Sequence, residues 1–197
     1  MHAVVLSESW GAYDYAEMDD GDEIKPDKPM AAFEKACVAA EELGKGVCRD
    51  QAVFTALLPE LVRGKAGRLF PFGKGLALAS VDHRSIWDQL TQAVAKTEEG
   101  KRNVDALVGF LNGLSTIDQP LCETLLEEAL SHETLGALFP ALQSSVFISA
   151  AGVGRLKRAV TLGRARAGAF PFLAWRSEVS EDDLRTLVLL IAKREHG

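Results

Sequence analysis

Five residues that suit the start of a helix recur along the chain at similar intervals. Asp and Ser side chains accept hydrogen bonds from the backbone N–H groups of a helix's first turn, and an apolar helical pattern follows each of the five. They are separated by 32, 36, 31 and 31 residues, and they are Asp50, Asp82, Asp118, Ser149 and Ser180. Periods of this length are typical of stacked helix pairs. The spacing predicts about five repeats of 31–36 residues.

The dipeptide Phe-Pro forms a second series. Its three copies, separated by 69 and 31 residues, are Phe70-Pro71, Phe139-Pro140 and Phe170-Pro171. The longer interval is twice 34 or 35, so an absent copy would fall near Val104-Asp105. Proline suits the first turn of a helix, where its missing N–H loses no hydrogen bond. Each copy therefore predicts a helix start.

The two series together predict the fold class and the domain organisation. No alternating Val- and Ile-rich segment indicates a strand, so we expect an all-α fold of stacked antiparallel helix pairs, an α-solenoid. The first helix has an apolar face from Phe33 to Leu43 and is expected to stop at Gly44 and Gly46, and Asp50 starts the second. Later helices are expected near residues 71–80, 83–96, 103–115, 119–131, 136–147, 152–162, 170–176 and 181–194. Residues 1–28 form an irregular acidic segment, and residues 29–197 form the helical-repeat domain.

This organisation resembles that of α-solenoids of the HEAT or armadillo kind, with a period shorter than is usual there. The resemblance covers Pro29 to Gly197. The tetratricopeptide period is closer, but the Trp, Leu-Gly, Tyr and Ala-x3-Phe pattern of that family does not fit these helices. The resemblance concerns architecture and carries no site residues. It implies a non-enzymatic, cytoplasmic scaffold for protein–protein interaction and, by analogy, the sensing part of a larger multidomain protein.

Composition and charge limit the other classes of function. With 197 residues, 47% of them hydrophobic and 25% charged, the chain needs no disulfide or metal to fold. It has no apolar run of the roughly 18 residues that a membrane span needs. The net charge of −6 is uneven, because residues 1–60 hold 13 acids and 5 bases and the remainder holds 15 acids and 17 bases. Extensive nucleic-acid binding is therefore not expected.

Motifs for catalysis or metal binding do not occur in the sequence. The three cysteines lack CxxC spacing and are expected to be small buried thiols, and the four histidines add no metal-binding pair. There is no Gly-x-Ser-x-Gly nucleophile elbow and no complete phosphate-binding loop. We predict no catalytic residue, no metal site and no cofactor.

One stretch is distinguished by its charge. No acidic residue occurs between Glu133 and Glu178, whereas six bases do, with Trp175 beside the last of them. Three interpretations are open: a basic face that is solvated or paired with the acidic N-terminal region, a surface for an acidic protein or peptide, or a site for phosphate, nucleotide or nucleic acid. The candidate binding residues are Arg155, Arg158, Arg164, Arg166, Trp175 and Arg176. Tryptophans are otherwise expected to be packing anchors, Trp87 above all.

The last predicted helix is apolar on nearly every face from Leu184 to Ala192. A terminal repeat normally has a polar outer face, and a helix that is apolar all round is normally buried. We therefore expect that the chain is a fragment of a longer solenoid or that this end docks on a partner or on a second copy.

Overall fold

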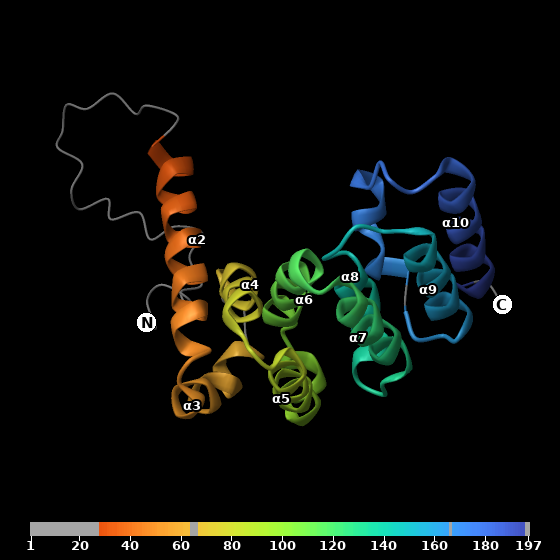
Figure 1. The fold of residues 1–197 in the computed structure, drawn as a ribbon. Helices are drawn as coiled ribbons and strands as arrows, with labels where there is room; N and C mark the ends of the chain where they lie inside the picture. The colour runs from red at the N-terminus through yellow and green to blue at the C-terminus, as the bar shows by residue number, and fades with distance from the viewer. Residues whose placement is uncertain (1–27, 64–66, 166, 196–197) are drawn as a thin grey trace.

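The structure, a computed structural model, describes residues 28–63, 67–165 and 167–195 (Figure 1). Within these ranges the chain forms nine α-helices, and the described backbone has no strand beyond one isolated bridge between Arg63 and Arg102. The helices are α2 (Lys28–Val47), α3 (Gln51–Leu61), α4 (Leu69–Ala79), α5 (His83–Lys96), α6 (Asp105–Ile117), α7 (Gln119–Ser131), α8 (Phe139–Gln143), α9 (Ala150–Thr161) and α10 (Glu181–Glu195). The all-α prediction is confirmed.

All five predicted helix caps are present. Asp50, Asp82 and Asp118 accept hydrogen bonds of 2.9–3.1 Å from backbone N–H groups in the first turns of α3, α5 and α7. Ser149 accepts one of 3.3 Å at the start of α9, and Ser180 accepts one of 3.2 Å at the start of α10. Each cap of this kind stabilises its helix by about 1 kcal/mol. The series therefore determines where five of the helices begin.

Two predicted helices are replaced by shorter and tighter turns. Residues 136–147 hold the 3-10 turn η3 (Leu135–Leu138) and the short α8, and residues 170–176 hold only the 3-10 turn η5 (Pro171–Trp175). Helix α8 ends early because the hydroxyls of Ser144 and Ser145 donate to backbone oxygens three residues earlier, at 2.7 and 2.6 Å. Two further 3-10 turns are η2 (Glu99–Lys101) and η4 (Ala167–Ala169).

The Phe-Pro series marks helix starts with one shift. Pro140 and Pro171 lie in the first turn of α8 and of η5, as predicted. Pro71 is the third residue of α4, where a missing N–H still loses no intrahelical bond. The absent copy near Val104 also corresponds to a helix start, because α6 begins at Asp105.

Helices α2 and α4 pack with their backbones in contact. A methyl group on Gly44 of α2 would overlap the backbone oxygen of Phe72, and one on Gly75 of α4 would overlap that of Glu41. Only glycine allows so close an approach of two helices. The prediction that Gly44 and Gly46 end α2 is wrong for Gly44, which lies inside the helix and makes room for α4, whereas α2 ends at Val47, one residue after Gly46.

Helices α4 and α6 repeat the same arrangement. A methyl group on Gly73 would overlap the backbone oxygen of Ala106, and one on Gly109 would overlap that of Phe70. In both pairs, each glycine faces the carbonyl three residues before the other glycine. The contacts are thus reciprocal, and they hold α2, α4 and α6 side by side as one row (Figure 1).

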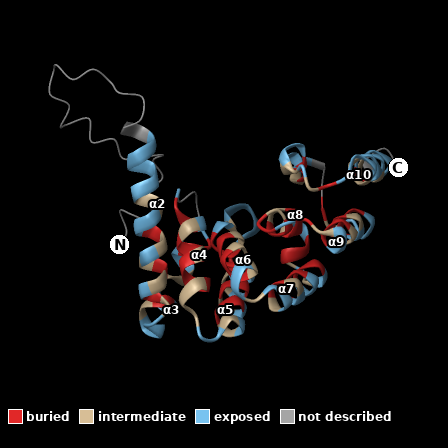
Figure 2. Ribbon diagram, turned by 45° about the horizontal axis from the view of Figure 1, so that its top comes forward, coloured by how far each residue is buried: buried red, intermediate tan, exposed pale blue. Residues whose placement is uncertain are grey.

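Helices α3, α5 and α7 form a second row, below the first in Figure 1. Phe110 of α6 joins the two rows: its ring centroid lies 6.3 Å from that of Trp87 of α5, and both side chains are buried. Trp87 is thus a packing anchor, as predicted. Figure 2 shows the buried residues concentrated where the rows meet.

The helices follow one another across the molecule in chain order, so that α2 and α10 lie at opposite ends (Figure 1). At the far end, Arg194 of α10 donates to the backbone oxygen of Val160 at 3.1 Å, where α9 ends. A positive side chain at this point is also attracted to the negative, C-terminal end of the helix dipole of α9. Among the described helices, none combines the length and apolarity that crossing a membrane requires.

Candidate interaction surface

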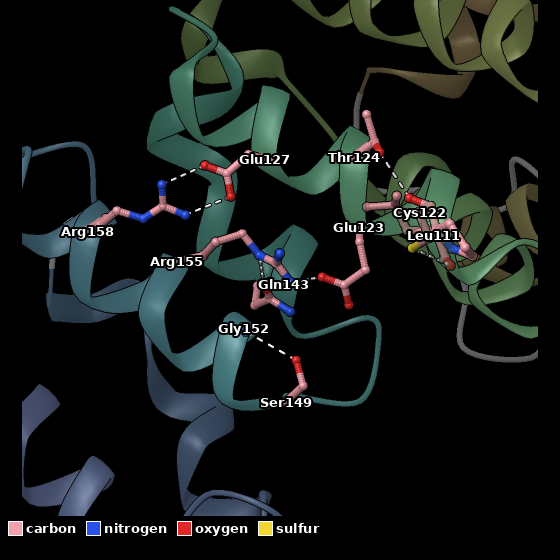
Figure 3. Close-up of polar contacts among 11 residues, drawn as sticks. Leu111, Cys122, Glu123, Thr124, Glu127, Gln143, Ser149, Gly152, Arg155 and Arg158 are labelled. Atoms are coloured by element: carbon pink, nitrogen blue, oxygen red, sulfur yellow. Dashed lines mark hydrogen bonds and ion pairs between the residues drawn. The ribbon is translucent and has the colours of Figure 1, made fainter.

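Arg155, a predicted binding residue, lies in the interior. It is 4% exposed on α9, and its Nε donates to Gln143 Oε1 at 2.9 Å (Figure 3). Its Nη2 lies 2.5 Å from Glu123 Oε2 of α7. Gly152 provides the space for this group, because a methyl group there would lie 3.0 Å from Gln143 Nε2. Arg155 therefore joins three helices from within.

The neighbouring bases of α9 are paired at the surface. Arg158 contacts Glu127 of α7 through two hydrogen bonds, both 2.6 Å long (Figure 3), which lower the pKa of Glu127 and raise that of Arg158. Lys157 Nζ lies 2.7 Å from Asp183 Oδ1 of α10, and this hydrogen bond lowers the pKa of Asp183. Each base thus has a carboxylate partner on an adjacent helix.

Arg176 is engaged in the same way. Its guanidinium donates to the backbone oxygen of Ser144 and lies 3.3 Å from Glu178 Oε1. The acids that pair with the basic stretch therefore come from α7, from α10 and from Glu178. The sequence did not reveal these partners, because they lie just outside the acid-free interval.

The other three candidates are distributed differently. Arg164 is half-buried beside Gly136, and Arg166 lies outside the described residues. Trp175 is 85% exposed at the end of η5, so the expectation that the tryptophans are packing anchors is wrong for this one. The structure brings Arg155 and Arg158 together on α9 and places Trp175 beside Arg176 on a separate segment.

A groove of about 590 Å³ opens between α4 and α6 on one side and two later segments on the other. Helix α4 supplies an aromatic residue, and α6 supplies a valine and two polar residues. The later segments supply a serine pair, a valine, a second aromatic residue and an ion pair. Its lining residues are Phe70, Val108, Asn112, Ser115, Ser144, Ser145, Val146, Phe147, Arg176 and Glu178.

The groove lies on the face of the first row that points away from the second. Val108, Asn112 and Ser115 recur at helical spacing and line the groove, whereas Phe110 on the opposite side of α6 packs against α5. The groove floor is therefore built on the glycine-packed helices. Sequence reasoning had no signal for it, because its two sides are 29 residues or more apart in the sequence.

The groove combines exposed aromatic rings with fixed polar groups. Phe70 is 39% exposed and Phe147 is 70% exposed. Asn112 Nδ2 donates to the backbone oxygen of Ser145 at 2.8 Å, which holds the α6 side to the opposite segment. The charges of Arg176 and Glu178 balance. Such a surface suits a ligand with apolar side chains and an uncharged polar backbone.

Two smaller grooves separate the helices of the second row. One of about 440 Å³ lies between α3 and α5, with Arg63 and Lys96 and no acid among its lining residues. Another of about 270 Å³ lies between α5 and α7 and is lined by Arg84, Glu128 and His132 among others. The second row is thus more open than the first, whose backbones touch.

The three cysteines of the chain are free thiols. Burial raises the pKa of the Cys122 thiol to about 12, while Cys37 and Cys48 are half-buried. Among the described residues, no group of three or more His, Cys, Asp or Glu side chains is arranged to hold a metal ion.

Comparisons with known proteins add no relative. The sequence matches no protein-family model, and neither the curated proteins nor the solved structures that were compared give a match.

Proposed function

We propose that this chain is an α-solenoid of helix pairs that acts as a non-enzymatic scaffold and binds a segment of another protein. Two features support the solenoid. The five caps recur at 31–36 residues, and the helices succeed one another along the molecule in chain order (Figure 1). Each repeat then contacts chiefly its neighbours, as in other repeat proteins.

The packing of the two rows gives this solenoid a direction of curvature. Backbones touch in the row of α2, α4 and α6, while grooves separate α3 from α5 and α5 from α7. A stack whose members lie closer on one side curves toward that side. The exposed face of α4 and α6 is therefore the inner face, which is where repeat proteins bind extended partners.

The observation that carries the functional proposal is the groove on that inner face. Its exposed Phe70 and Phe147 are aromatic residues, which are enriched in protein interfaces, and its polar residues suit the backbone of an extended peptide. With Arg176 and Glu178 in balance, the groove does not select a highly charged ligand. The proposed ligand is an extended segment with at least one large apolar side chain.

The test is a selection of peptides from a random displayed library on the wild-type chain. Selected peptides are then measured in solution against Phe147→Asp and against Ile117→Asp, which changes an exposed apolar residue outside the groove lining. We expect Phe147→Asp to weaken binding by at least about tenfold and the control to change it little. Equal affinity for both variants, or no selectable peptide, would exclude the groove as the binding site.

Phosphate or nucleic-acid binding through the basic stretch remains the alternative prediction. A phosphate at Arg158 or Arg176 must displace a carboxylate already bound there, and Arg155 is buried. We therefore place this alternative second to peptide binding.

A further inference from the structure

The last helix exposes an ordered stripe on its outer side. Leu187 is fully buried against the body of the molecule, whereas Leu189 on the opposite side is 61% exposed. Arg185 and Lys193, four residues to either side, are also exposed. The outer stripe of α10 is thus base, apolar residue, base.

The first described helix exposes the opposite stripe. Ala40 is fully buried, whereas Val38 on the outer side is 63% exposed. Glu34 and Glu42, four residues to either side, are exposed as well. The outer stripe of α2 is acid, apolar residue, acid. Figure 2 shows both helices as largely exposed along these sides.

The two stripes match over four positions when the helices run antiparallel. Read backward at steps of three, four and four residues, α2 presents Lys45, Glu42, Val38 and Glu34. Read forward at the same steps, α10 presents Asp182, Arg185, Leu189 and Lys193. Every charge then faces its opposite, and the apolar residues face each other. Beside this apolar pair, Ala39 faces the 60% exposed Val188, which widens the apolar contact.

We propose that α10 of one copy docks antiparallel on α2 of a second copy, head to tail. The two helices lie at opposite ends of the molecule (Figure 1), so each copy offers one end to each neighbour. Such a contact joins different surfaces and extends the row of helices across copies. Lys45 is already paired within α2, with Glu41 at 2.9 Å and Glu42 at 2.8 Å. The pairs to test are therefore the two that flank the apolar contact, Glu42 with Arg185 and Glu34 with Lys193.

The experiment is sedimentation velocity of the whole chain across the micromolar range, with two charge-reversed variants. One variant is Arg185→Glu with Lys193→Glu, and the other is Glu34→Lys with Glu42→Lys. We expect the wild type to associate with rising concentration and each variant alone to associate at least about tenfold more weakly. Equimolar mixing of the two variants restores opposite charges at the contact and therefore restores association.

The controls separate this contact from other effects. Arg49→Glu with Lys96→Glu changes the net charge by the same amount and sign as Arg185→Glu with Lys193→Glu, but at exposed positions elsewhere, and it should associate like the wild type. Phe147→Asp, in the groove, should also leave association unchanged, so this inference and the proposed function fail independently. The proposal would be overturned if the wild type stays monomeric, and α10 would then be left to pack against a further repeat of a longer chain. It would also be overturned if the charge-reversed variants associate as the wild type does.

Discussion

At the scale of single residues, Arg155 shows how a sequence signal acquires a different meaning in the fold. Its place in an acid-free stretch predicted an accessible base. The structure instead buries it between Glu123 and Gln143, and the acid comes from a helix more than 30 residues earlier. The charge of a segment is visible in the sequence, but the partner depends on which helices become neighbours.

Replacing Arg155 tests this structural role. Arg155→Met removes the hydrogen bond to Gln143 Oε1 and leaves Glu123 beside an apolar chain, so we expect a loss of about 2–3 kcal/mol in the free energy of unfolding. Arg158→Ala, which breaks an exposed pair on the same helix, should cost less than about 1 kcal/mol. Urea unfolding measures both. Similar losses for the two variants would contradict the buried role.

At the scale of helices, the glycine contacts determine how close the neighbours lie. Gly44 and Gly46 are two residues apart in α2, yet a methyl group would overlap a backbone oxygen at Gly44 and would meet nothing within 4 Å at Gly46. The pair therefore separates the effect of close packing from the effect of helix propensity.

We expect opposite results for alanine at these two positions. Gly44→Ala must push α2 away from α4 and should destabilise the fold by about 1–3 kcal/mol. Gly46→Ala should stabilise it by up to about 1 kcal/mol, because alanine forms helix better than glycine. Thermal or urea unfolding of both variants checks this. Two changes of the same sign would mean that the backbones do not limit the helix spacing.

The start or end of a helix could be predicted from the sequence where a local interaction causes it, and could not where a distant helix causes it. The caps at Asp50, Asp82 and Asp118 were predictable because capping is a local interaction. The continuation of α2 through Gly44 was not, because its reason is the backbone of α4 about 30 residues later. The early end of α8 depends on two serine hydroxyls, whose choice of acceptor the sequence leaves open.

At the scale of the whole molecule, ion pairs between helices are spread from α2 to α10. Glu41 of α2 contacts Lys74 of α4, Glu127 of α7 contacts Arg158 of α9, and Asp183 of α10 contacts Lys157. Burial alone would raise the pKa of Glu41, but hydrogen bonds from Lys45 and Lys74 leave it below its usual value. The pKa values of Glu127 and Asp183 are also lowered by their partners.

These shifts predict a loss of stability in acid. A carboxyl whose pKa is lowered in the folded state stabilises the fold when the pH lies above its usual pKa, which is 4.5 for Glu and 3.8 for Asp. This contribution disappears as the pH falls through the folded-state pKa. We expect urea midpoints to fall between about pH 5 and about pH 3, and to fall less steeply in Glu127→Gln with Asp183→Asn. Parallel curves for the two proteins would assign the acid sensitivity to other groups.

The reciprocal glycines also have a consequence for how the groove responds to a ligand. Where α4 meets α6, the spacing is set by main-chain atoms, so rotation about side-chain bonds cannot alter it. The facing segment, by contrast, is attached through side chains such as Asn112, Arg176 and Glu178, each of which has several staggered positions. One side of the groove is thus held by main-chain contacts between α4 and α6, and the other side is held by side-chain hydrogen bonds to residues 144–148. If the groove binds a segment of another protein as proposed, we expect any adjustment to different ligands to occur in the side chains that hold residues 144–148, while α4 and α6 keep their spacing.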